Sequence, residues 1–206
     1  MIPNKYKGLL IDFEGLDGAG SSTQSLLLAA LLKRQGLKVQ VTKEPTNNLI
    51  GGLIRGQLTG EWKADPECLQ LLFAADRAHH QKREIIPMLK RGNIVICDRY
   101  AFSSIAFGSL DISDPKWLEN INEKFILPDI TFVLKVPPKI CLARLEKVRY
   151  SLELYEEVEK MEKIWRVYEQ IAQQYPNIYI INGERKEEKI LNEISKIVKK
   201  LLKLDK

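Results

Sequence analysis

A glycine-rich run, GLDGAGSST at residues 15–23, constrains this chain more than any other feature. Residues 9–13 before it have the length and composition of a buried strand, and residues 24–35 after it carry leucine and alanine at helical spacing. A glycine loop between a strand and a helix presents unpaired backbone N–H groups and the positive end of a helix dipole, which together suit a phosphate. The alternative is a glycine-rich turn with a serine cap on the helix.

The run has the framework of a phosphate-binding loop without its lysine. In the pattern G-x-x-x-x-G-K-[ST], the lysine reaches the phosphates and the final hydroxyl binds magnesium. Gly15 and Gly20 keep the glycine spacing, and Ser21 stands where the lysine is expected. Ser22 or Thr23 can supply the hydroxyl, so the loop is expected to bind phosphate with one cation missing.

Length, charge and cysteine content indicate a single cytoplasmic domain spanning residues 1–206. A hydrophobic content of 45% is enough for one core, and a net charge of +5, spread along the chain, gives little support for a nucleic-acid partner. Cys68, Cys97 and Cys141 are far apart in apolar stretches, which predicts buried free thiols in a reducing compartment. The polar residues 1–7 do not resemble a signal peptide, and no run reaches the ~18 apolar residues of a membrane span, so no membrane partner is expected.

Strand-like runs alternate with helical runs along the rest of the chain. The expected strands are residues 9–13, 38–42, 93–97, 130–136 and 177–181, and the expected helices are residues 24–35, 66–90, 115–124, 139–147, 154–174 and 186–204. Five strands that alternate with helices predict an α/β fold, in which helices cover both faces of a five-stranded parallel sheet.

A charged pair, Asp98 and Arg99, directly follows the strand expected at residues 93–97. Ligands of open α/β sheets collect at the carboxyl ends of the strands, so this pair should face the same crevice as the glycine loop. An aspartate there can hold magnesium, and an arginine can bridge phosphates. The alternative is an ion pair that caps the strand.

Phe73 and Arg77 are four residues apart on the helix expected at residues 66–90, so they share one face of it. An aromatic ring beside a guanidinium suits a flat heterocycle that carries a carbonyl. The alternative is a core phenylalanine beside a surface arginine. His79 and His80 lack a carboxylate at metal-ligand spacing, which favours a solvated helix face over a metal site.

Taken together, these segments resemble thymidylate kinases. The resemblance rests on FEGLDGAG at 13–20, TKEPT at 42–46, IG at 50–51 with IR at 54–55, LFAADR at 72–77, DRY at 98–100 and SSIAF at 103–107, in this order. It implies a three-layer, nucleoside monophosphate kinase-like fold with a short lid at about residues 144–153. It also implies transfer of the γ-phosphoryl group of ATP to dTMP with magnesium, giving dTDP and ADP, and a homodimer.

The resemblance assigns a role to each matching residue. Phe73 would stack on thymine, and Arg77 would donate a hydrogen bond to the O4 carbonyl. Gly18 stands where some family members carry a catalytic arginine, so the lid residues Arg144 or Arg149 should supply that charge. The implied ATP site is Gly15, Gly18, Ala19, Gly20, Ser21, Ser22 and Thr23; the implied dTMP site is Asp17, Glu44, Arg55, Phe73, Arg77, Arg99, Ser104 and Phe107; the implied magnesium ligands are Ser22 and Asp98; and the implied catalytic residues are Asp98, Arg99, Arg144 and Arg149.

Departures from the family pattern leave two alternative functions open. Ser21 removes the expected ammonium group, for which Lys43 is a conceivable replacement, and Gly108 replaces a polar residue that is common after the aromatic at Phe107. One alternative is a kinase that accepts dUMP or other nucleoside monophosphates, and the other is a nucleotide-binding protein with little catalysis. The apolar residues in 69–75 and 121–127 could form a dimer face, or they could belong to the core.

Overall fold

The structure is a computed structural model, in which residues 1–146 and 154–202 are described. A five-stranded sheet with the order β3-β4-β2-β6-β7 lies at its centre, and every neighbouring pair of its strands is parallel. The five strands are β2 (Leu9–Gly15), β3 (Val39–Lys43), β4 (Ile94–Asp98), β6 (Ile130–Lys135) and β7 (Ile178–Asn182). The predicted α/β fold with a parallel five-stranded sheet is therefore confirmed.

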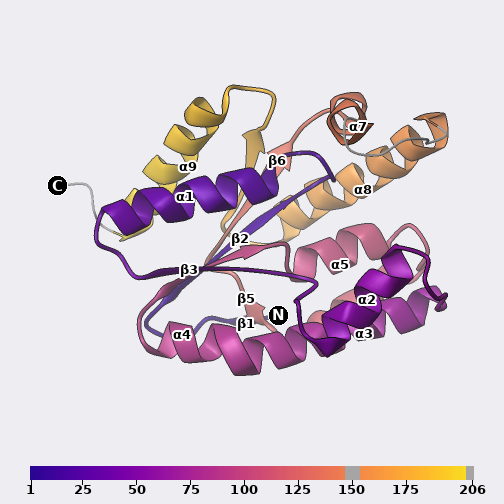
Figure 1. Cartoon of the computed structure of the whole chain (residues 1–206), viewed down its shortest axis with the longest axis horizontal. Coiled ribbons are helices and arrows are strands. Elements are labelled where there is room, and N and C mark those ends of the chain that lie inside the picture. The colour runs from indigo at the N-terminus through magenta and orange to yellow at the C-terminus, as the bar shows by residue number, and fades with distance from the viewer. Residues whose placement is uncertain (147–153, 203–206) are drawn as a thin grey trace.

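Helices cover both faces of this sheet and complete three layers (Figure 1). Helices α1 (Ser21–Arg34) and α9 (Glu187–Leu202) lie on one side. On the other side lie α3 (Pro66–His80), its continuation through a π-helical turn (Gln81–Ile85) into α4 (Ile86–Lys90), and α5 (Ala101–Gly108). The remaining helices are α2 (Leu49–Leu58), α6 (Pro115–Asn122), α7 (Pro138–Glu146) and α8 (Leu154–Gln174).

The central strands β2 and β4 are apolar in sequence because both of their faces are buried. Leu10 and Ile11 on β2, and Val95 and Ile96 on β4, are completely shielded from solvent. Strand β2 also carries two carboxylates, Asp12 and Glu14, that are fully buried. These two side chains point to the same face of the sheet because successive residues of a strand alternate between faces.

Four elements were missed in the sequence. Helix α2 contains three glycines, which weaken the local helix signal. Helix α5 has only 8 residues, and strands β1 (Ile2–Pro3) and β5 (Ile126–Leu127), which pair with each other, have 2 residues each. Segments this short give no measurable hydrophobic period, so only the three-dimensional context reveals them.

The structure corrects one expectation about apolar segments and bears on a second. Cys97 and Cys141 are buried as expected, but Cys68 in the first turn of α3 is exposed because this turn lies at the surface of the helix layer. In the segment 121–127, Phe125 and Ile126 are buried in the core, whereas Leu71 in the segment 69–75 is 52% exposed. Core burial, one of the two alternatives, therefore accounts for Phe125 and Ile126, whereas Leu71 is open to solvent.

The lid predicted at residues 144–153 lies mostly outside the described part of the chain. Arg144 is on α7 and is described, whereas residues 147–153, Arg149 among them, are not. In the described part, no helix is long and apolar enough to cross a membrane.

Helix α2 approaches the preceding loop closely at Gly51. A β-carbon at Gly51 would lie 1.9 Å from the carbonyl oxygen of Thr46, whereas one at Gly52 would meet only an Arg55 nitrogen at 3.8 Å. We expect Gly51→Ala to lower the free energy of unfolding by about 1–3 kcal/mol because helix or loop must move. Gly52→Ala should leave it unchanged or raise it by up to about 1 kcal/mol. Urea denaturation of both variants measures the difference, and equal losses would contradict this packing.

Candidate active site

The glycine loop joins the carboxyl end of β2 to the amino end of α1, as its sequence predicts. Gly15, Gly18 and Gly20 have φ angles of 148°, 83° and 100°, which side chains with a β-carbon rarely adopt. Gly20 is the N-cap of α1, and no side chain caps the helix. The alternative of a serine-capped turn is therefore wrong, and the N–H groups of the first helical turn face the loop without a side-chain acceptor.

The loop borders a cavity of about 460 Å³. Among the described residues, its basic lining side chains are Arg99, Arg144 and Arg185. Ser21 also lines the cavity, at the position where the sequence pattern expects a lysine. A cavity that combines a glycine loop, a helix amino end and three guanidinium groups is suited to a polyphosphate.

Helix α7 explains why the loop has glycine at position 18. A β-carbon there would lie 2.6 Å from the carbonyl oxygen of Cys141, which belongs to α7. Any side chain at this position would push the helix away from the loop. Arg144 on the same helix instead donates hydrogen bonds to the carbonyl oxygens of Gly18 and Ala19, at 3.1 and 3.3 Å, and so holds helix and loop together.

Asp98 and Ser22 meet at the carboxyl end of β4. The Ser22 hydroxyl donates to Oδ2 of Asp98 at 2.5 Å, and Oδ1 of Asp98 is buried with no hydrogen-bond partner among the described residues. A hydroxyl beside a carboxylate with a spare oxygen is the kind of ligand set that Mg²⁺ prefers. These two residues fit the magnesium role that the sequence suggested for them.

Arg99 occupies a strained turn between β4 and α5. Its φ angle is 69°, uncommon for a residue with a β-carbon, and its guanidinium donates to the Gly15 carbonyl at 3.1 Å, to Ser103 Oγ at 3.1 Å and to Asp17 at 2.6 Å. The same group lies 4.9 Å from the centre of the Phe107 ring. Burial alone would lower the pKa of Arg99, but Asp17 and other acidic groups raise it overall, so the side chain stays charged.

Arg77 is buried, which contradicts the alternative of a surface arginine. It is 1% exposed and donates to Glu44 at 2.8 Å, to Asn122 at 2.5 Å, to the Tyr100 carbonyl at 3.1 Å and to Ser104 at 2.9 Å. Four of the five donors of the guanidinium are therefore used within the protein. Ser104 and Glu44, both predicted for the dTMP site, lie here because they hold this arginine.

The other residues predicted for the dTMP site surround this region. Phe73 is half-buried one helical turn before Arg77. Arg55 donates a hydrogen bond to the carbonyl of Thr46, and Asp76 accepts hydrogen bonds from the Thr46 amide and hydroxyl at 2.7 and 2.6 Å. The segment around Thr46 is thus anchored to α3 beside the carboxyl end of β3.

His80 is buried, so the predicted solvated face is correct for His79 alone. The Nδ1 atom of His80 lies 3.0 Å from Glu44, and its Nε2 atom lies 2.6 Å from the Thr42 hydroxyl. Glu44, His80 and Cys97 offer ligand atoms within 4.8 Å of one another, a spacing that a metal ion could use. Each of these atoms already has a partner, since the Cys97 thiol donates to the carbonyl of Arg99, and hydrogen bonds account for the cluster.

Arg185 was not singled out in the sequence. It follows β7 and lines the loop cavity together with Arg99 and Arg144. It also pairs with Glu193 of α9. Its position just beyond the carboxyl end of a parallel strand is a signal that could have identified it.

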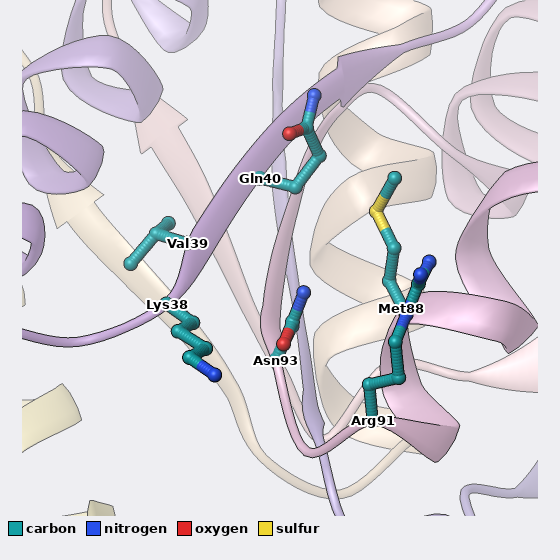
Figure 2. A pocket seen from close by; sticks show the side chains of 6 residues that line it. All are labelled: Lys38, Val39, Gln40, Met88, Arg91 and Asn93. Atoms are coloured by element: carbon teal, nitrogen blue, oxygen red, sulfur yellow. The ribbon is translucent and has the colours of Figure 1, made fainter.

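A second cavity lies at the opposite end of the strands (Figure 2). It has a volume of about 540 Å³ and is lined by Lys38, Val39, Gln40, Met88, Arg91 and Asn93. Residues 38–40 and 93 lie at the amino ends of β3 and β4, whereas ligands of open parallel sheets bind at the carboxyl ends of the strands. A third cavity, of about 560 Å³, adjoins Ser22 and Asp98 and includes Lys43. The candidate active site is therefore the group of residues at the carboxyl edge of the sheet.

The fold, together with the glycine loop at the carboxyl edge of the sheet, defines a nucleoside monophosphate kinase-like protein. The family model of thymidylate kinase matches residues 13–194, and the chain belongs to the thymidylate kinase family. A probable thymidylate kinase of Pyrococcus horikoshii is 38% identical over 199 residues, covering 94% of this chain and 97% of the relative. The thymidylate kinase of Plasmodium falciparum is 38% identical over 205 residues, covering 98% of this chain and 94% of the relative.

A solved structure supports the same assignment. The crystal structure of thymidylate kinase from Ehrlichia chaffeensis superposes with a TM-score of 0.75 at 26% identity, covering 93% of this chain and 98% of that chain. The family resemblance seen in the sequence is thereby confirmed. The roles of individual site residues remain predictions.

Arg77 supplies a test of how the site is built. We expect Arg77→Ala to lower the free energy of unfolding by about 3–5 kcal/mol, because it leaves the carboxylate of Glu44 buried without its guanidinium partner. Arg91→Ala, at an exposed position of the far cavity, is the matched control and should change stability little. Urea denaturation compares the two variants. Equal stability of Arg77→Ala and Arg91→Ala would show that the buried ion pair with Glu44 contributes nothing.

Proposed function

We propose that this protein transfers the γ-phosphoryl group of ATP to the phosphate of dTMP, giving dTDP and ADP. The observation that carries the proposal is that Arg99 contacts both the glycine loop, through Gly15 and Asp17, and helix α5, through Ser103 and Phe107. The same helix carries Ser104, which accepts a hydrogen bond from Arg77. One side chain thus joins a polyphosphate cavity to a site suited to a flat base. Family membership supports dTMP as the acceptor.

Phosphoryl transfer requires that the protein align the two substrates and supply positive charge. Phosphoryl transfer involves little covalent participation by protein groups, so the rate depends on the position of the two substrates and on cations near the transferring oxygens. Two phosphorylated substrates repel each other. We infer that Arg99 holds the dTMP phosphate against the loop, because its guanidinium lies between the two halves of the site and is charged.

Ser22 and Asp98 would hold magnesium, which when bound would neutralise charge on the ATP phosphates. Support for this role is the Ser22 hydroxyl at 2.5 Å from Asp98 and the spare buried oxygen of that carboxylate. The backbone N–H groups of the loop would surround the phosphates of ATP. The loop residues concerned are Gly15, Gly18, Ala19, Gly20, Ser21, Ser22 and Thr23.

Phe73 and Arg77 would recognise the thymine base of dTMP. The ring of Phe73 provides a stacking surface, and Arg77 keeps one N–H on Nη1 beyond the four hydrogen bonds it makes within the protein. A rigidly held N–H favours the O4 acceptor of thymine and disfavours cytosine, which presents an amino group at that place. The dTMP site would be completed by Asp17, Glu44, Arg55, Ser104 and Phe107.

Arginines would replace the missing loop lysine. Arg144 lies on the loop backbone, and Arg185 lines the same cavity. Lys43 is exposed at the end of β3, where it is in register with Asp98, and lines the adjoining cavity. We infer that Arg144 serves as a catalytic residue together with Arg99 and Asp98. Arg149, which shares this predicted role, lies outside the described residues.

The proposal extends to the state of the protein in the cell. We infer a homodimer that packs through helices, supported by the exposed Leu53 of α2 and Leu71 of α3 on two helices that pack together. We also propose a cytoplasmic location, which the three free cysteines support. The reaction needs neither a nucleic acid nor a membrane.

A coupled assay of ADP release, with dTMP, dUMP, dCMP and dGMP as separate acceptors, tests the proposed function. We expect dTMP to give the highest kcat/KM. Phe73→Ala should weaken binding of every acceptor, by about 1–3 kcal/mol if base–aromatic stacking is lost.

The same assay separates the alternatives. Comparable kcat/KM values for several acceptors would indicate a kinase of broader specificity. Absence of dTDP at every temperature where the protein stays folded would contradict the kinase function and favour a nucleotide-binding protein with little catalysis.

A further inference from the structure

Glu14 is a buried carboxylate beside the Arg99 turn, and no role described so far uses it. It is fully shielded from solvent on β2. Its Oε1 accepts hydrogen bonds from the Tyr100 amide at 3.0 Å and the Ser103 amide at 2.9 Å. Its Oε2 accepts from the Ser103 hydroxyl at 2.5 Å and the Tyr168 hydroxyl at 2.7 Å. Four donors on two oxygens fill the acceptor capacity of the carboxylate.

Three of these four hydrogen bonds hold the residues that follow Arg99. The left-handed turn at Arg99 leads through Tyr100 into the first residues of α5, and Glu14 binds the backbone there twice. The Ser103 hydroxyl donates to Glu14 and accepts from Nη1 of Arg99 at 3.1 Å. The carboxylate therefore orients the hydroxyl that in turn orients the guanidinium.

The fourth hydrogen bond brings in a distant part of the chain. Tyr168 is a fully buried residue of α8, and its hydroxyl also lies 3.3 Å from Ser103 Oγ. Helix α8 begins at Leu154, directly after residues 147–153, and packs against α5 and α7. A movement of α8 would change the hydrogen bonds at Glu14.

We propose that Glu14 is a positioning residue that sets the Arg99 guanidinium through Ser103 and, through Tyr168, makes that setting depend on α8. The inference rests on the proposed function, in which Arg99 holds the phosphate that accepts the phosphoryl group. Removing one member of a network that fixes a phosphate-binding arginine should impair turnover more than nucleotide binding, because small misplacements near the reacting atoms are costly.

Asp12 provides a matched control. It is two residues before Glu14 on the same face of β2 and is also fully buried, but Oδ1 has no partner among the described residues and Oδ2 has only the Thr131 hydroxyl at 3.4 Å. Burial raises the pKa of both carboxyl groups, and at Glu14 the charge of Arg99 and the surrounding donors oppose this rise. Asp12→Asn therefore changes a buried carboxyl group that makes no hydrogen bond to the Arg99 turn.

The kinetic test compares Glu14→Gln, Tyr168→Phe and Asp12→Asn in the full chain. We expect Glu14→Gln to lower kcat about 10–100-fold, with the KM for ATP within about twofold of wild type. Tyr168→Phe should lower kcat less, and Asp12→Asn should leave kcat within about twofold. If Glu14→Gln does not fold, Tyr168→Phe, which removes one hydroxyl, carries the comparison. Equal kcat in all four proteins would overturn the proposal.

A double-mutant cycle separates positioning from general stabilisation. If Glu14 acts through Arg99, adding Glu14→Gln to Arg99→Ala should lower kcat no further than Arg99→Ala alone. A purely structural role predicts that the two losses multiply. Multiplicative losses would overturn the proposal even if Glu14→Gln alone is impaired.

A spectroscopic readout keeps the test independent of activity. The side-chain Nε–H resonance of Arg99 can be assigned by its loss in Arg99→Ala. We expect this resonance to shift or broaden in Glu14→Gln and Tyr168→Phe and to stay in place in Asp12→Asn. An unchanged resonance in Glu14→Gln would overturn the proposal, whereas an inactive wild type with the expected resonance changes would count only against the kinase function.

Discussion

The contacts of one arginine connect the two halves of this molecule's active site. Arg99 donates to the carbonyl of Gly15 and the carboxylate of Asp17 in the loop, and to Ser103 at the start of α5. These contacts require the left-handed turn at Arg99, which brings the side chain back over the end of β2. The parallel sheet makes this possible because β2 and β4 are neighbours, so that the loop and the Asp98–Arg99 pair emerge side by side. The buried carboxyl group of Glu14 accepts hydrogen bonds from the amides of Tyr100 and Ser103 and so holds the residues that follow the turn.

Charge is the second constraint on the site. Two phosphate groups must approach each other in a loop where Ser21 stands in place of a lysine. The cavity is lined instead by Arg99, Arg144 and Arg185, which come from the turn after β4, from α7 and from the segment after β7. Because these cations come from separate elements, the charge around the loop depends on how the elements pack. At position 18 the close approach of α7 leaves room for glycine alone, so an arginine within the loop is excluded while α7 keeps this place.

Much of the fold could be predicted from the sequence because its central strands are apolar runs between helices of clear period. The bounds of β3, β4 and β7 differ from expectation by one residue at each end. The loop and the Asp98–Arg99 pair were predictable because chemistry and position coincide: each follows a buried strand of a parallel sheet. Helices α2 and α5 were not, since glycines weaken the first and the second is a short helix whose start depends on the turn at Arg99.

Side-chain partners were harder to predict than side-chain positions. His80 and Arg77 lie on a helix that reads as amphipathic with a polar face, yet both are buried, because Glu44 arrives from the end of β3 to pair with them. A sequence pattern on one helix carries no information about a carboxylate that is 33 residues away in the chain and only 2.8 Å away in space. Arg185 was missed for the same reason, since only the three-dimensional structure shows that it lines the same cavity as the loop.

The central claim is that cations outside the loop supply the charge that a loop lysine normally provides. The most direct measurement is the single-turnover rate of dTDP formation by Ser21→Lys, with ATP affinity and folding measured alongside. The account predicts that the rate is preserved or raised, because a lysine at this position adds a cation to an intact phosphate site. A Ser21→Lys protein that folds and binds ATP normally but loses phosphoryl transfer would contradict it, since positive charge beside the phosphates would then not be what this loop lacks.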